Sequence, residues 1–70
     1  MGTEKNTGTQ QSLDRALDLL DILAKNESNG LNISEISKML GISRVTASTM
    51  VQTLLHRNYI EKDADSTRYR

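Results

Sequence analysis

Residues 41–43 (Gly-Ile-Ser) separate two segments whose apolar residues recur at helical spacing. The first segment, about 33–40, follows Asn32 and carries Glu35, the pattern of a helix start in which these two residues cap each other. Glycine ends a helix readily because it adopts the left-handed conformation, and serine is a favoured cap for the next helix. Because so short a connection makes the two helices cross, the sequence predicts a helix-turn-helix.

The helix after this turn is predicted over about 43–57, and its outward face is the most informative surface of the chain. Its apolar stripe is formed by Ala47, Met50, Val51 and Leu54. The opposite face carries short or hydrogen-bonding side chains without negative charge, which suit the major groove of DNA, whereas an ordinary solvated helix carries Glu and Lys pairs. We therefore predict that this helix contacts DNA through Ser43, Arg44, Val45, Thr46, Ser48, Thr49, Gln52 and His56.

Residues 59–70 change from helical to strand-like content. Residues 59–62 and 68–70 read as strands, and the intervening Asp, Ser and Thr residues are typical of a turn. The predicted hairpin carries Lys62 and Arg68, which suit contact with a phosphate backbone. The predicted fold class is mostly α with a small β-hairpin, a winged helix-turn-helix of three helices plus a wing.

A first helix is predicted from Ser12, which is a suitable cap, to about residue 25. Two further apolar residues, Leu19 and Ile22, widen its apolar surface beyond the stripe expected to face the core. Because a chain of 70 residues without cysteine has a small core, we expect these two side chains to face a second subunit in a homodimer, with simple exposure as the alternative. The predicted core stripe is formed by Leu13, Ala16, Leu17, Leu20, Leu23 and Ala24.

The net charge of zero leaves two functions open, but the charges are unevenly distributed. Residues 1–35 carry three basic and six acidic residues, and residues 36–70 carry the reverse. Residues 36–60 include no Asp or Glu, which is the local property that a phosphate-facing surface needs. The leading hypothesis is sequence-specific binding of double-stranded DNA. The alternative is a winged-helix protein-interaction module without DNA readout.

Other functional classes have little support. The chain has one His, no Cys, no Gly-rich phosphate loop and no metal-ligand spacing. We therefore predict no enzymatic activity, no catalytic residue, no metal site and no cofactor. No apolar run approaches a membrane span and no signal-peptide pattern is present, so a cytoplasmic protein without membrane contact is expected. Residues 1–10 are polar and are expected to form a flexible tail ahead of one domain over 11–70.

Five blocks of the chain are informative together: QSLDRALDLLDILA (11–24), LNISEI (31–36), LGISR (40–44), LLHRNYIEKD (54–63) and RYR (68–70). Together they resemble the IclR family of bacterial transcription regulators. The resemblance covers residues 11–70 and implies an N-terminal domain that binds operator DNA as a dimer, with the helix at about 43–57 in the major groove and the wing at about 59–70 on the backbone. It also implies a C-terminal domain that binds a small-molecule effector and is absent here, so the chain is expected to be a fragment of a longer regulator. Asn58 stands where the family usually has Gly, and Asn tolerates the left-handed conformation.

Overall fold

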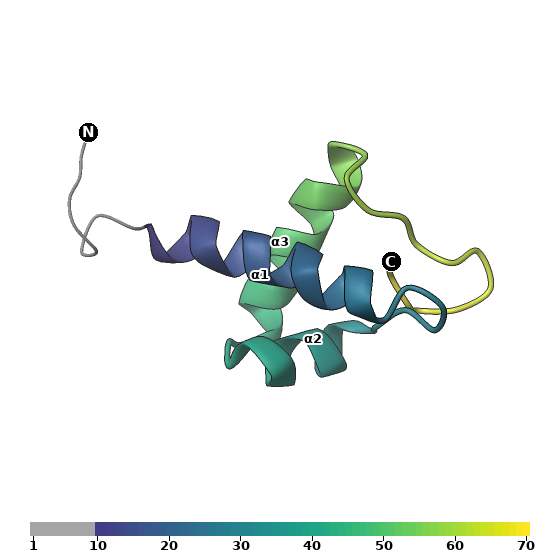
Figure 1. Ribbon diagram of the computed structural model, residues 1–70, viewed down its shortest axis with the longest axis horizontal. Coiled ribbons are helices and arrows are strands. Elements are labelled where there is room, and N and C mark those ends of the chain that lie inside the picture. Colours follow the sequence, from purple (N-terminus) through teal and green to yellow (C-terminus); the bar gives the residue numbers. More distant parts are fainter. Residues whose placement is uncertain (1–9) are drawn as a thin grey trace.

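The computed structural model describes residues 10–70 and contains three helices (Figure 1). They are α1 (Gln11–Lys25), α2 (Ile33–Leu40) and α3 (Arg44–His56), and α3 runs at a steep angle to the other two. Residues 1–9 of the predicted tail lie outside the described residues.

Capping interactions fix the ends of α2 and the start of α3. The Asn32 carboxamide oxygen accepts the Glu35 backbone N–H at 2.9 Å, and a Glu35 carboxylate oxygen accepts the Asn32 backbone N–H at 3.0 Å. Gly41 follows α2 in the left-handed conformation, with φ 67° and ψ 38°. Ser43 Oγ then accepts the Thr46 backbone N–H at 3.0 Å. The predicted helix-turn-helix is confirmed, because its two caps and its left-handed glycine all form where the sequence places them.

The start of α1 differs from the prediction. Gln10 is the residue before the first turn, and its carbonyl oxygen accepts the Asp14 backbone N–H at 2.9 Å. Ser12, the predicted cap, lies inside the first turn, and no side chain caps the helix. The helix therefore begins two residues earlier than a capping serine at position 12 would allow.

One small core holds the three helices together. Leu19, Ile36 and Val51 are completely buried, one from each helix. Ala47 is also fully buried, and Met50 and Leu54 pack at the edge, so the predicted apolar stripe of α3 is confirmed. The remaining buried apolar residues are Leu23, Leu31, Ile60 and Tyr69.

The prediction for the buried face of α1 is right in part, because Leu23 is buried and Leu20 packs against the core, but other leucines differ from it. Leu19 is fully buried and cannot face a second subunit, and Ile22 is half-buried against the core. Leu13 and Leu17, which were expected inside, are 55% and 51% exposed. Leu13 and Leu17 are four residues apart and share one face of α1, which differs from the face that carries the buried Leu19 and Leu23. The buried face of α1 is therefore rotated relative to the predicted stripe.

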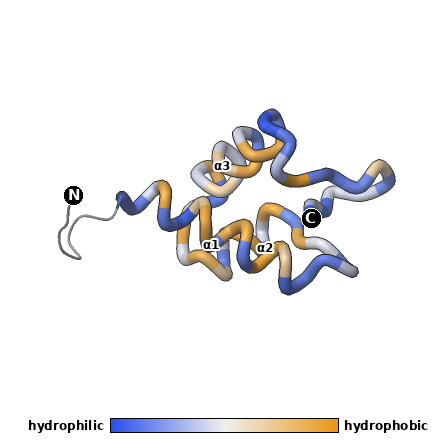
Figure 2. Tube along the Cα trace, turned by 45° about the horizontal axis from the view of Figure 1, so that its top comes forward, coloured by the Kyte–Doolittle hydropathy of each residue, from blue (hydrophilic) through white to orange (hydrophobic). Residues whose placement is uncertain are grey.

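Residues 59–70 turn back on themselves after α3. Asn58 provides the break with φ 67°, as expected for an asparagine in place of glycine. The chain pairs in antiparallel fashion at Lys62 and Tyr69, and Tyr69 pairs on its other side with Leu31. These are isolated bridges and not strands, so the predicted β-hairpin is seen only as a turned-back segment. Figure 2 shows that this segment is mostly hydrophilic.

Gly30, in the loop before α2, lies close to the backbone of the C-terminal segment at Tyr69. Its φ is +74°, and a Cβ atom built there would lie 2.8 Å from the Tyr69 carbonyl oxygen. Gly41 has a similar φ of +67°, but nothing lies within 4 Å of its added Cβ. Gly41→Ala is expected to lower the free energy of unfolding by about 1 kcal/mol, because alanine is strained in the left-handed conformation. Gly30→Ala is expected to lower it by about 1–3 kcal/mol more, because the backbone at Tyr69 must also move. Urea unfolding of both variants checks this, and equal losses would contradict the close approach.

Candidate nucleic-acid interface

The outward face of α3 is exposed along the length of the helix. Val45 is 77% exposed, the most exposed of the large apolar side chains in the described residues, and Gln52 and His56 follow it on the same face. The buried Ala47 and Val51 fix the rotation of the helix, so this face is held outward by the core. The predicted α3 residues Ser43, Arg44, Val45, Thr46, Thr49, Gln52 and His56 are exposed, and Ser48 is half-buried.

Several hydroxyl groups on this surface are hydrogen-bonded within the helix. Thr49 Oγ1 donates to the Val45 carbonyl oxygen at 3.0 Å, and Ser43 Oγ donates to Thr46 Oγ1 at 2.9 Å. Within residues 10–70, no hydrogen bond or ion pair engages the side chains of Arg44, Gln52 or His56. The long polar side chains thus remain available to a ligand, while the hydroxyl oxygens keep lone pairs that can accept hydrogen bonds.

Arg44 and Lys62 converge on one groove of about 370 Å³ between α2, α3 and the C-terminal segment. Lys62 Nζ also donates to the Ser66 carbonyl oxygen at 2.6 Å, which ties down the turn that carries it. Arg57 follows α3 at its opposite end. The basic residues therefore do not line one face, because Arg44 and Lys62 lie together at the start of α3 and Arg57 lies at its other end. The other residues that line this groove are Asn32, Ile33, Ser34, Thr67 and Tyr69.

Arg68 is directed into the protein. Its guanidinium donates to the carbonyl oxygens of Asn29 and Gly30, and it forms an ion pair with Glu35 at 2.8 Å. Arg70 is paired with Asp63 at 2.5 Å. Both arginines of the C-terminal segment thus have acidic partners within the chain, so only Lys62 among its cations lines the groove with Arg44.

The hydrogen bond from the Asn32 backbone N–H lowers the pKa of Glu35, and Arg68 acts in the same direction. Because the folded-state pKa lies below the ordinary value of 4.5, the stabilisation is present above that value and is lost as the pH falls through the lowered pKa. We expect the difference in unfolding free energy between the wild type and Glu35→Gln to be constant above about pH 5 and to shrink in more acid solution. Chemical unfolding at several pH values measures it, and a difference independent of pH down to 3 would contradict the shift.

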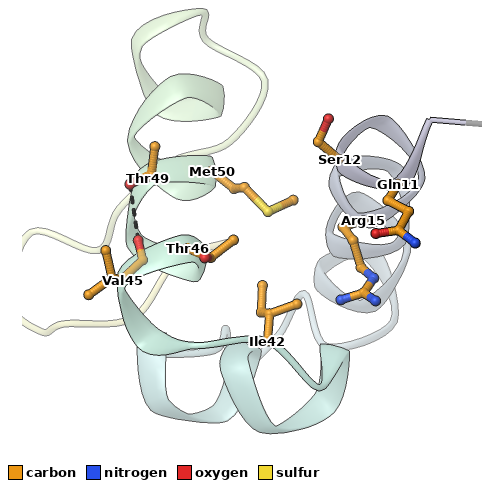
Figure 3. Close-up of a pocket in the computed structure, with 8 residues that line it drawn as sticks. All are labelled: Gln11, Ser12, Arg15, Ile42, Val45, Thr46, Thr49 and Met50. Carbon is orange, nitrogen blue, oxygen red and sulfur yellow. Dashed lines mark hydrogen bonds between the residues drawn. The ribbon is translucent and has the colours of Figure 1, made fainter.

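Nothing in the sequence indicates that the first turns of α1 lie beside the first turns of α3. An open groove of about 450 Å³ separates the first turns of α1 from the first turns of α3 (Figure 3). Met50 and Ile42 point into it, whereas Val45 points away from α1. Arg15 Nη1 lies 3.4 Å from the Leu40 carbonyl oxygen, which holds this arginine beside the turn. The α1 residues that line the groove are Gln11, Ser12 and Arg15, and they form an edge of the interface that only the fold reveals.

Metal-ligand clusters and membrane-spanning helices are both absent from residues 10–70. No group of three or more His, Cys, Asp or Glu residues in this range lies close enough to hold a metal ion. No helix there is long and apolar enough to cross a membrane. The exposed face of α3 and the adjoining groove form the candidate site within the described residues.

Comparison with known proteins places this geometry in context. The family model of the IclR helix-turn-helix domain matches residues 12–64. The chain is 35% identical over 60 residues to the HTH-type transcriptional regulator XynR of Escherichia coli, which covers 86% of this chain. It is 39% identical over 59 residues to the glycerol operon regulatory protein of Streptomyces coelicolor (84% of this chain) and 36% identical over 66 residues to the regulator BhcR of Paracoccus denitrificans (94%). The chain spans 23% of the length of each relative. No solved structure matches it significantly.

Proposed function

Because the chain belongs to the IclR family of helix-turn-helix transcription regulators, we propose that it binds double-stranded operator DNA sequence-specifically, with α3 in the major groove. The observation that supports this most is the outward face of α3, which is exposed, carries no acidic residue and is held in orientation by the buried Ala47 and Val51. A major groove of about 12 Å admits one helix, and its base edges offer donors, acceptors and thymine methyl groups to such side chains. The relatives are named as regulators and none as an enzyme.

Each side chain of this face suits a particular contact. The Gln52 carboxamide can bond an adenine edge through two hydrogen bonds, and the exposed Val45 can contact a thymine methyl group. Arg44 and Lys62 line one groove and supply positive charge for the phosphates on one side of α3. In this proposal residues 59–70 act as the wing, with Lys62 as its phosphate contact.

We also propose that the regulator binds as a homodimer, because two half-sites multiply the affinity of one weakly bound domain. The surface available on α1 is formed by Leu13 and Leu17, since Leu19 is buried. Leu17→Asp is expected to lower the fraction of dimer measured by sedimentation without lowering the unfolding temperature. An unchanged fraction would place the dimer contact elsewhere. Effector recognition belongs, in this proposal, to the rest of a longer regulator.

Selection from a randomised duplex library tests the proposal. The chain should enrich one sequence motif, and its affinity for the selected duplex should fall steeply with salt, because phosphate contacts release counterions. Enrichment of no motif, or binding that salt leaves unchanged, would contradict DNA readout. It would favour the protein-interaction alternative, which the net charge of zero allows.

A further inference from the structure

Arg68 joins the C-terminal segment to the start of α2. Its Nε donates to the Asn29 carbonyl oxygen at 3.0 Å, and its Nη2 donates to the Gly30 carbonyl oxygen at 3.2 Å and to Glu35 Oε1 at 2.8 Å. Its side chain is 34% exposed. A guanidinium presents five N–H groups in a rigid fork, so these three contacts occupy most of what Arg68 can donate.

The same Glu35 oxygen takes part in the cap of α2. Glu35 Oε1 accepts the Asn32 backbone N–H at 3.0 Å as well as the Arg68 guanidinium. The anchor of the C-terminal segment and the N-terminus of α2 therefore share one atom. A change in the ionisation or identity of residue 35 acts on both at once.

Backbone pairing carries this anchor to Lys62. Tyr69, next to Arg68, exchanges two backbone hydrogen bonds with Leu31 at 2.9 and 2.7 Å. On its other side Tyr69 is bridged to Lys62, and Asp63 donates its backbone N–H to the Arg68 carbonyl oxygen at 2.9 Å. The place at which Arg68 is held thus determines where Lys62 stands relative to Arg44.

We propose that Arg68 and Glu35 are positioning residues for DNA binding. They hold the C-terminal segment against α2 so that Lys62 and Arg44 face the same stretch of phosphate backbone, in place of a direct phosphate contact by Arg68. This inference rests on the proposed function for its role in DNA binding, while the anchor itself is measurable without DNA.

The two roles for Arg68 predict opposite effects of Glu35→Gln. If Arg68 contacts phosphate, removing the competing carboxylate frees the guanidinium and removes a negative charge, so binding tightens. If Arg68 positions the segment, the same substitution loosens the anchor and binding weakens. Glutamine keeps an oxygen that can accept the Asn32 N–H, so the cap of α2 survives the change.

The experiment measures affinity for the selected duplex at several salt concentrations, with Glu35→Gln, Arg68→Lys, the double variant and the control Asp65→Asn. Asp65 is exposed on the same segment, so its replacement removes a negative charge without touching the anchor. Glu35→Gln and Arg68→Lys should each weaken binding about threefold to tenfold, the effect of one or two lost hydrogen bonds. Lysine keeps the charge and loses the fork. The fold-loss of affinity in the double variant should be no larger than the product of the two single fold-losses. Asp65→Asn should not weaken binding.

Tighter binding by Glu35→Gln, or wild-type affinity for Arg68→Lys, would overturn the inference and favour a direct phosphate contact. If the wild-type chain selects no duplex, the proposed function fails separately, and amide hydrogen exchange then decides whether the anchor exists. Glu35→Gln should speed exchange of the Leu31 and Tyr69 amides relative to Asp65→Asn. Unchanged exchange at both amides would also overturn the inference.

Discussion

Leu19→Ala is expected to destabilise the chain by about 2–5 kcal/mol, because it empties the centre of the core. Leu19 is completely buried and packs among side chains from all three helices. A small domain has only about 5–15 kcal/mol of stability in total, so this loss should remove a large share of it and clearly lower the unfolding temperature. Thermal unfolding followed by circular dichroism measures the loss.

Leu17→Ala is the matched control for this prediction. It removes the same atoms from the same helix at a position that is 51% exposed, and at concentrations where the chain is monomeric its effect should stay within about 0.5 kcal/mol. Equal losses at the two positions, or a larger loss at Leu17, would show that α1 packs by the face first predicted from its periodicity.

Gln52→Ala is expected to weaken binding to the selected duplex by about 1–3 kcal/mol and to relax the preference at one base pair. Arg44→Ala should weaken binding to all duplexes by a similar factor. It should also lower the slope of log affinity against log salt concentration (the salt slope) by about one, as expected for a lost phosphate contact. Neither side chain is buried, so neither substitution should lower the unfolding temperature by more than a surface change does. Quantitative gel shifts with a panel of single-base variants measure both effects.

Lys25→Ala is the control for charge. It removes one positive charge from the last turn of α1, at a residue that lines neither groove beside α3. Its salt slope should equal that of the wild type. If Lys25→Ala lowers the salt slope as much as Arg44→Ala does, binding depends on total charge and not on a specific phosphate contact from α3.

The helix-turn-helix was predictable because its signals are local. The Asn32–Glu35 pair, the left-handed Gly41 and the Ser43 cap each act within four residues, and all three form in the structure. The division of α3 into buried and outward faces was predictable for a similar reason, since all apolar residues of that helix except Val45 lie on one side of it.

The buried face of α1 could not be predicted in this way. Its leucines, isoleucine and alanines cover more than half of the helix circumference, so periodicity alone leaves the rotation open. The choice is made by where α2 and α3 lie, which buries Leu19 and Leu23 and leaves Leu13 and Leu17 exposed. The role of Arg68 was hidden for a related reason, because its partner Glu35 is 33 residues away in the sequence.

The most direct test of major-groove readout by α3 uses the absence of cysteine from the chain. Val45→Cys places one thiol on the exposed face of α3, and Leu17→Cys places one on the exposed face of α1. Each is mixed with the selected duplex carrying a thiol tethered to a base in the major groove, and disulfide formation is followed in time. We predict rapid cross-linking of Val45→Cys and little of Leu17→Cys. Equal rates for the two, or cross-linking of Leu17→Cys alone while both variants still bind the duplex, would contradict the account.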